Sequence, residues 1–270
     1  MNQIKTFGER YTYSLILLKE FVKTDFKLKY QGSVLGYAWT LLRPLALFIV
    51  LYVVFVKFLR VGESVPHFPN YLLLGIVLWN FFSDLTNGAI GSVVSRGDLI
   101  RKISFPKYVI VIATSVSALI NLLINMIIIF LFMTIFGADP SLEAIAVLPL
   151  AILLLFVLGM GIGFILASLF VNYRDVNYIW EVVMQAGFYA TPVLYPLQIM
   201  PESAQKILMI NPAAVIIQEA RKSMITEQTI TAHSLYGGYI GYFPMIIVIL
   251  ICLFGFYIFR KKSKNFAEDI

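Results

Sequence analysis

Long runs of apolar residues, each bounded by charged or turn residues, recur along the chain. A helix needs about 20 mostly apolar residues to cross roughly 30 Å of hydrocarbon. Six runs have about that length, at 36–56, 70–91, 108–136, 145–171, 176–194 and 239–259. The second is the weakest, because after Phe82 it becomes polar through Ser83, Asp84 and Asn87. The pattern predicts an all-α integral membrane protein with six transmembrane helices.

The segment before the first run has a different pattern. Between residues 11 and 30, apolar side chains recur at helical spacing, at Leu15, Leu18, Val22 and Phe26. Basic side chains follow another face, at Lys19, Lys23, Lys27 and Lys29. Such a helix lies on a membrane surface without crossing it, and anionic lipid attracts each lysine by roughly 1 kcal/mol. We therefore predict that residues 1–34 carry an amphipathic interface helix whose lysines meet lipid head groups; a solvated basic leader is the alternative.

The connection between the fifth and sixth runs, residues 195–238, is too long for a simple turn. It contains Pro196, Pro201 and Pro212, and its apolar stretches are too short to span a bilayer. Irregular backbone at membrane depth is tolerated only where protein or a water-filled cavity surrounds it. We expect short external helices at 196–236 that re-enter the membrane or lie at its outer surface.

Composition supports the membrane class. The 270 residues are 60% hydrophobic and 13% charged, whereas soluble domains are about 45–50% apolar and about 25% charged. This excludes a soluble enzyme, and it excludes a disordered or fibrous chain, because so many apolar side chains do not stay solvated. The first 30 residues contain no apolar core that ends at a small-residue cleavage site, so we expect no cleavable signal peptide.

The net charge of +6 is explained by topology. With six spans, fifteen of the 21 Lys and Arg residues lie on the side shared by both termini, and five lie on the opposite side. The positive-inside rule then predicts a multi-pass protein of the cytoplasmic membrane with both termini, including a tail at 261–270, in the cytoplasm. Nucleic acid is not an expected partner.

Signatures of catalysis are missing from the sequence. A P-loop needs Gly-Lys, which occurs nowhere, and no H-E-x-x-H, G-x-S-x-G or D-x-D pattern is found. His67 and His233 fall in predicted outer loops without a ligand cluster, and Cys252 is the single cysteine. We expect a conduit that is not an enzyme and has no catalytic residue, metal site or cofactor of its own.

Polar residues within spans are costly, at about 2.5–3.5 kcal/mol for a central charge on insertion scales, and are therefore functional candidates. Asp84 is expected to face the bundle interior with Arg43 as a candidate partner, although Arg43 also lies where it can snorkel to the interface. Aromatic side chains near span ends either form interfacial belts or present faces to sugar rings in a passage. The candidate channel lining is Trp39, Arg43, Trp79, Phe82, Asp84, Trp180, Glu181, Phe188, Tyr189 and Tyr195. Small residues in the fourth run, Gly159, Gly163 and Ala167, permit close packing, within the bundle or between subunits.

Several motifs occur together in a characteristic order. They are Tyr30 to Trp39 after the interface helix, a basic stretch from Ser95 to Lys107, Arg174-Asp175-Val176, Thr191 to Pro196, and Asn211-Pro212. In this order, over about residues 10 to 262, the chain resembles the ABC-2 type permeases. Within that family it is most similar to the subunits that export lipid-linked polysaccharide, such as O-antigen, capsule and teichoic acid.

The resemblance implies a transmembrane domain at 35–260 that acts as two copies with two separate ATPase subunits, which bind ATP and Mg. It implies a coupling helix at about 96–105 that contacts the ATPase through Arg96, Gly97, Asp98, Leu99, Ile100, Arg101 and Lys102. The first, second and fifth spans would border the channel, and 196–236 would form an external gate. The implied substrate is a lipid-linked glycan such as O-antigen; wall teichoic acid, or a drug or lipid, remains the alternative.

Overall fold

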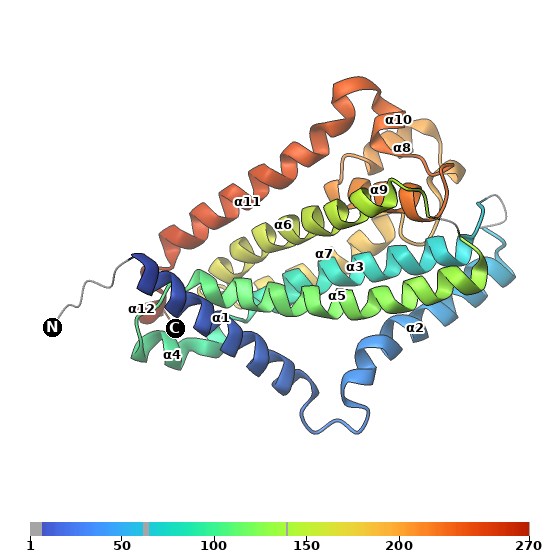
Figure 1. Cartoon of the computed structure of the whole chain (residues 1–270). Helices are drawn as coiled ribbons and strands as arrows, with labels where there is room; N and C mark the ends of the chain where they lie inside the picture. Colours follow the sequence, from blue (N-terminus) through green and yellow to red (C-terminus); the bar gives the residue numbers. More distant parts are fainter. Residues whose placement is uncertain (1–6, 62–64, 139, 270) are drawn as a thin grey trace.

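In the computed structural model, residues 7–61, 65–138 and 140–269 are described. These residues form helices and turns without any strand, which confirms the all-α class. The first six residues of the predicted N-terminal region lie outside the described part. Figure 1 shows an elongated bundle with α1, α4 and α12 at one end and α8, α9 and α10 at the other. The start of α1, the stretch that contains α4 and the last helix of the chain thus share one end of the molecule.

Helices follow one another along the whole chain. The long ones are α1 (Phe7–Tyr30), α2 (Trp39–Tyr52), α3 (Phe68–Ile90), α5 (Tyr108–Phe136), α6 (Ala144–Phe170), α7 (Val176–Ala190), α9 (Pro212–Met224) and α11 (Phe243–Lys262). The short ones are α4 (Gly97–Lys102), α8 (Glu202–Leu208), α10 (Ala232–Tyr236) and α12 (Phe266–Asp269). Single 3₁₀ turns occur at η1 (Gly36–Ala38), η3 (Val94–Arg96), η4 (Leu197–Ile199) and η5 (Gly238–Tyr242), and a π-helical turn, η2 (Val53–Phe58), continues α2.

Five helical segments of the described chain are long and apolar enough to cross a membrane. They are Gly36–Phe58, Phe68–Ile90, Tyr108–Phe136, Ala144–Phe170 and Gly238–Lys262, and they correspond to five of the six predicted spans. The predicted span at 176–194 differs: α7 ends at Ala190 after 15 residues, about 22 Å at 1.5 Å per residue. Thr191 is extended because it precedes Pro192, which disfavours helical backbone at the residue before it.

The second apolar run is the structural centre of the bundle despite its polar character. In α3, 72% of the span window is buried, against 11% for the segment that contains α2. Close contacts to α3 come from the small residues of α6: a Cβ on Gly159 would lie 2.6 Å from Leu85, and one on Gly163 would lie 2.8 Å from Ala89. These two glycines therefore serve packing inside one chain.

The third glycine of this stretch, Gly161, faces the opposite side of α6. A Cβ on Gly161 would lie 2.6 Å from the Cα of Cys252, and one on Gly255 would lie 2.1 Å from the carbonyl oxygen of Gly161. The α6 and α11 backbones thus touch at a glycine pair. Figure 1 shows α11 on one flank of the bundle and α2 on the opposite flank.

Candidate functional site

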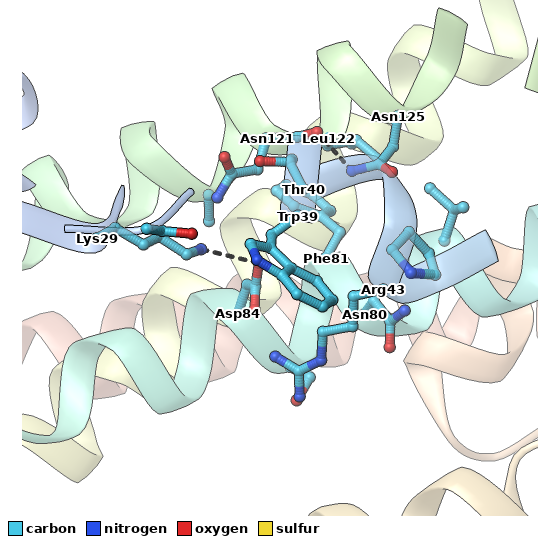
Figure 2. Close-up of a pocket in the computed structure, with 15 residues that line it drawn as sticks. Lys29, Trp39, Thr40, Arg43, Asn80, Phe81, Asp84, Asn121, Leu122 and Asn125 are labelled. Carbon is cyan, nitrogen blue, oxygen red and sulfur yellow. Dashed lines mark hydrogen bonds and ion pairs between the residues drawn. The ribbon is translucent and has the colours of Figure 1, made fainter. Parts of the chain in front are cut away.

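A polar pocket lies among the end of α1, α2, α3 and α5 (Figure 2). Its volume is about 280 Å³. Aromatic and apolar walls come from Trp39, Pro44, Val77, Phe81, Ala118 and Leu122. Polar and charged groups come from Lys29, Ser33, Thr40, Arg43, Asn80, Ser83, Asp84, Asn121 and Asn125. Polar groups that are costly within apolar helices thus gather around one space.

Asp84 is paired at the mouth of this pocket. Its Oδ2 lies 3.7 Å from Nζ of Lys29 on α1, as Figure 2 shows. The expected pairing of Asp84 with Arg43 is therefore wrong in this structure, although Arg43 lines the same pocket. The side chains of Lys29 and Asp84 are 50% and 42% exposed, so the pair is open to water and contributes at most about 1 kcal/mol.

Side-chain amides form the deeper wall. Nδ2 of Asn125 donates to the carbonyl oxygen of Asn121 at 2.8 Å. Oδ1 of Asn125 is buried and has no hydrogen-bond partner among the residues that the structure describes. A buried amide oxygen normally has a partner, so it offers an acceptor to a hydroxyl group or a water in the pocket. With Trp39 half exposed nearby, the pocket is chemically suited to hydroxyl-rich ligands and to anionic groups near its two cations.

The remaining candidate channel residues separate into two groups. Trp79 and Phe82 are buried at 5% and 6% exposure and pack on each other at 5.6 Å between ring centroids. Trp79 also contacts Phe188 at 6.2 Å. The structure therefore places Trp79 and Phe82 in the core of one chain, because α3 is covered on several sides, and not at an open surface.

The second group lies on or just after α7. Glu181 and Tyr189 are exposed, while Trp180, Phe188 and Tyr195 are half buried. The hydroxyl of Tyr195 donates to the carbonyl oxygen of Tyr189 at 3.1 Å. This face of α7 carries both apolar and carboxylate groups and does not join the pocket in Figure 2.

The basic stretch 96–105 contains the short helix α4, which follows η3. Its side chains divide by face: Gly97 and Ile100 are buried, and the exposed ones are Asp98, Leu99, Arg101 and Lys102. Leu99 is 39% exposed. A six-residue helix with an exposed apolar side chain between charges is an available contact surface for another protein.

Arg96 connects this stretch to α1. Its guanidinium forms a salt bridge with Asp25 and lies 4.8 Å from the ring centroid of Phe21, and Phe21 packs on Phe105 at 5.9 Å. Burial raises the pKa of the Asp25 carboxyl, while the charge and hydrogen bond of Arg96 act to lower it. The helix α1 and the stretch 96–105 are thereby held together by a partly desolvated ion pair with aromatic support.

The lysines of α1 lie at the surface. Lys19, Lys23, Lys27 and Lys29 are all exposed, whereas Phe21 is buried. Asp25 and Lys29 lie one helical turn apart, so α1 contacts Arg96 with one residue and Asp84 with the next along the same face.

Sequence reasoning missed Arg221. In the sequence analysis it is only one of the five basic residues expected on the side opposite the termini. In the structure it is fully buried in α9. Its guanidinium donates to the carbonyl oxygens of Tyr71 (3.0 Å) and Val193 (2.7 Å), to that of Pro192, and to Oε1 of Gln218 (3.1 Å). It also stacks on the Tyr71 ring at 3.7 Å. The signal in the sequence is slight: an arginine that follows Ala213 to Ile217 at helical spacing.

The same region joins two of the sequence motifs. Asn211 caps α9 by accepting from the backbone N–H of Ala213 at 3.0 Å, and its Nδ2 donates to Oγ1 of Thr191 at 3.1 Å. Together with Arg221, this cap holds the extended segment after α7 against α9 and α3. The Thr191 to Pro196 and Asn211-Pro212 motifs are thus one structural unit.

Comparison with known proteins identifies the family. The family model described as ABC-2 type transporter matches residues 17–225. The chain is 27% identical to the O-antigen export system permease protein RfbA of Myxococcus xanthus over 99% of this chain and 100% of the relative. It is 27% identical to a protein of that name from Klebsiella pneumoniae and 22% identical to the polysialic acid transport protein KpsM of Escherichia coli, each over 95% of both chains. The chain therefore belongs to the ABC-2 type transporter family.

Proposed function

We propose that the protein is the membrane permease subunit of an ABC transporter that exports a lipid-linked polysaccharide, such as O-antigen, across the cytoplasmic membrane. Its full-length similarity to two O-antigen export permeases and to a polysialic acid transport protein supports this function. ATP hydrolysis belongs to a separate subunit with its own ATP and Mg. The observation that carries the proposal is a pocket among helices long and apolar enough to span a membrane, lined by amide, hydroxyl and aromatic groups that suit sugars.

The proposed assembly contains two copies of this chain and two ATPase subunits. The transmembrane domain covers 35–260, and α7 with the segment up to 194 is its fifth span, which brings the total to six. The helices α8, α9 and α10 form the external gate region at 196–236, where re-entry beside α3 would account for the burial of α9. The excess of cations on the side of α1, α4 and α12 supports a cytoplasmic location for both termini.

The proposed coupling path runs through named contacts. Closure of the ATPase subunits moves α4, whose exposed Asp98 and Leu99 contact the partner. Because Arg96 is paired with Asp25, α1 moves together with α4. Lys29, one helical turn after Asp25, is paired with Asp84, so movement of α1 also displaces α3. The end of α1 borders the pocket, so displacement of α1 would change access to it.

The proposed substrate path begins at the cytoplasmic leaflet. The exposed lysines of α1 attract the phosphate groups of a lipid carrier, and the sugars pass the polar side chains of the pocket and the exposed face of α7. Contacts at several weak sites allow passage, whereas one tight site would retain the chain.

Deletion of the gene in its native host tests the function. We expect lipid-linked glycan to accumulate inside the cell and surface glycan to disappear. The intact gene should reverse the accumulation and restore the surface glycan. The sugar composition of the retained material distinguishes O-antigen from teichoic acid. Normal surface glycan in the deletion strain would overturn the export function, and accumulation of a drug or a simple lipid instead would favour the alternative substrate.

A further inference from the structure

A second pocket, outside the proposed glycan path, lies between the start of α5 and the end of α11. Its volume is about 460 Å³. It is lined by Phe105, Pro106, Lys107, Tyr108, Phe256, Phe259, Arg260, Ser263 and Lys264. It lies on the α11 flank of the bundle, whereas the pocket of Figure 2 lies beside α2 on the other flank (Figure 1).

Three of the lining side chains are cations, and none is a carboxylate. In the described part of the chain, Lys107, Arg260 and Lys264 form no salt bridge with an acidic residue. Lys107 donates to the carbonyl oxygen of Ser263 and lies 5.9 Å from the ring centroid of Phe266, so it is held between the two helix ends. Burial lowers the pKa of Lys107 without an opposing anionic neighbour. Among the residues that the structure describes, the site thus has positive charge without a paired carboxylate.

Helix geometry adds to this charge. Lys107 occupies the N-cap position of the 29-residue helix α5 without a side-chain cap, and there the aligned peptide dipoles leave partial positive charge. Arg260 belongs to the last turn of α11, and its charge also complements the negative end of that helix. Lys264 lies past the helix and is exposed, so it remains available for an anion.

The walls of the pocket are aromatic and continue into an apolar surface. Tyr108 and Phe256 are each 37% exposed and lie 6.0 Å apart between ring centroids. Beyond them, α11 exposes a row of large apolar side chains: Ile246, Ile249, Leu250, Leu253 and Phe254. An occupant with a phosphate would match the basic end of the pocket, and its hydrocarbon chains would match the apolar row of α11. Basic pockets between helices at the cytoplasmic leaflet bind lipid head groups of this kind.

We propose that this pocket binds an anionic glycerophospholipid of the cytoplasmic leaflet, with its phosphodiester between Lys107, Arg260 and Lys264 and its acyl chains along α11. The lipid is a structural ligand and not the exported substrate. Its position joins α5 to α11 next to Phe266, which is buried beside the coupling region. Occupancy therefore stabilises the corner of the protein on which α4 rests.

The test is a lipid titration of the purified full-length protein in nonionic detergent, followed by native mass spectrometry. Phosphatidylglycerol and phosphatidylcholine with identical acyl chains are compared. We expect phosphatidylglycerol to bind more tightly, and each of Lys107→Gln, Arg260→Gln and Lys264→Gln to weaken it about fivefold. Lys264→Gln is the decisive variant, because its exposed side chain carries no hydrogen bond on which folding depends.

The matched control is Lys261→Gln. It also removes one positive charge, from the position next to Arg260, but Lys261 does not line the pocket. It should leave phosphatidylglycerol binding unchanged. An equal loss in Lys261→Gln, or equal affinity for the two lipids, would overturn the site. Displacement of the lipid by millimolar inorganic phosphate would indicate a simple ion site and overturn the lipid assignment. The lipid assignment would also be overturned if the three pocket variants lost association with the ATPase subunit but still bound phosphatidylglycerol normally. In that case the cations would contact the partner protein.

Discussion

The guanidinium of Arg96, just before α4, forms a salt bridge with the carboxylate of Asp25 on α1. The two side chains are only 12% and 23% exposed, so the pair is better shielded than the Lys29 and Asp84 pair one turn further along α1. In a partly desolvated pair, loss of one partner leaves an uncompensated charge. Among the described salt bridges, this one directly joins α1 to the stretch that contains α4.

The first prediction concerns that connection. Asp25→Asn should reduce surface glycan several-fold, while the purified complex still hydrolyses ATP, because movement of α4 no longer reaches α1. Export is measured in complemented deletion cells and ATPase activity on the complex. The exposed neighbour Thr24→Ala is the control and should export normally. Full export by Asp25→Asn would contradict the coupling role.

The exposed face of α4 leads to a second prediction. Leu99→Asp should abolish co-purification of the ATPase subunit, because an apolar contact is replaced by a charge, while the permease itself stays folded. Ile100→Ala should do the reverse: its side chain is buried, so the substitution costs about 2–5 kcal/mol of stability. The elution profile in size-exclusion chromatography separates the two effects. Retained ATPase binding by Leu99→Asp would remove α4 from the interface.

A third prediction concerns the pocket beside α2. Asp84→Asn removes the partner of Lys29 and the carboxylate of the pocket, and we expect export to fall with little change in folding, since the pair is open to water. Glu143→Gln, which removes an exposed carboxylate before α6, is the control. Export is compared at equal membrane levels of the proteins. Equal export by the two variants would argue against a passage along this pocket.

Arg221 provides a prediction of stability. Arg221→Met keeps the approximate length of the side chain but leaves the carbonyl groups of Pro192 and Val193 without their donor. At about 1–3 kcal/mol for each unsatisfied buried group, the apparent Tm of the detergent-solubilised protein should fall sharply. Lys222→Gln changes an exposed neighbour and should shift stability by no more than about 0.5 kcal/mol. An unchanged Tm for Arg221→Met would show that these carbonyls find other donors.

The glycine contact between α6 and α11 leads to the last prediction. Gly255→Ala would put a Cβ 2.1 Å from the carbonyl oxygen of Gly161, so the two helices must separate and the apparent Tm should drop. At Gly91, a Cβ would meet nothing within 4 Å, and Gly91→Ala should be close to neutral. Thermal unfolding followed by fluorescence compares the variants. Similar Tm values would mean that α11 shifts at little cost.

Much of the fold follows from local pattern. The apolar runs at 108–136 and 145–171 differ from α5 and α6 by at most one residue, because length and hydropathy act through the bilayer and hardly depend on neighbours. The end of α7 at Ala190 was predictable from Pro192, although the apolar run continues to Leu194. Whether α7 completes a sixth span stays a prediction.

The candidate site could be predicted only in part. The sequence named Trp39, Arg43 and Asp84 as candidate channel residues, and the structure brings all three to one pocket. Trp79 and Phe82 belong to the same apolar run as Asp84 but are buried in the core. The sequence did not predict this, because helical periodicity alone does not say which side of α3 other helices cover.

Residue type and spacing determined the membrane class, the amphipathic α1 and the asymmetry of charge, since each arises from side chains that interact with solvent or lipid one at a time. Tertiary structure decided which polar groups meet. Asp84 pairs with Lys29, and Arg221 lies buried among backbone carbonyls from α3 and the segment after α7. These partners are far apart in sequence, and their contact depends on how closely the helices pack, which single-residue preferences do not encode.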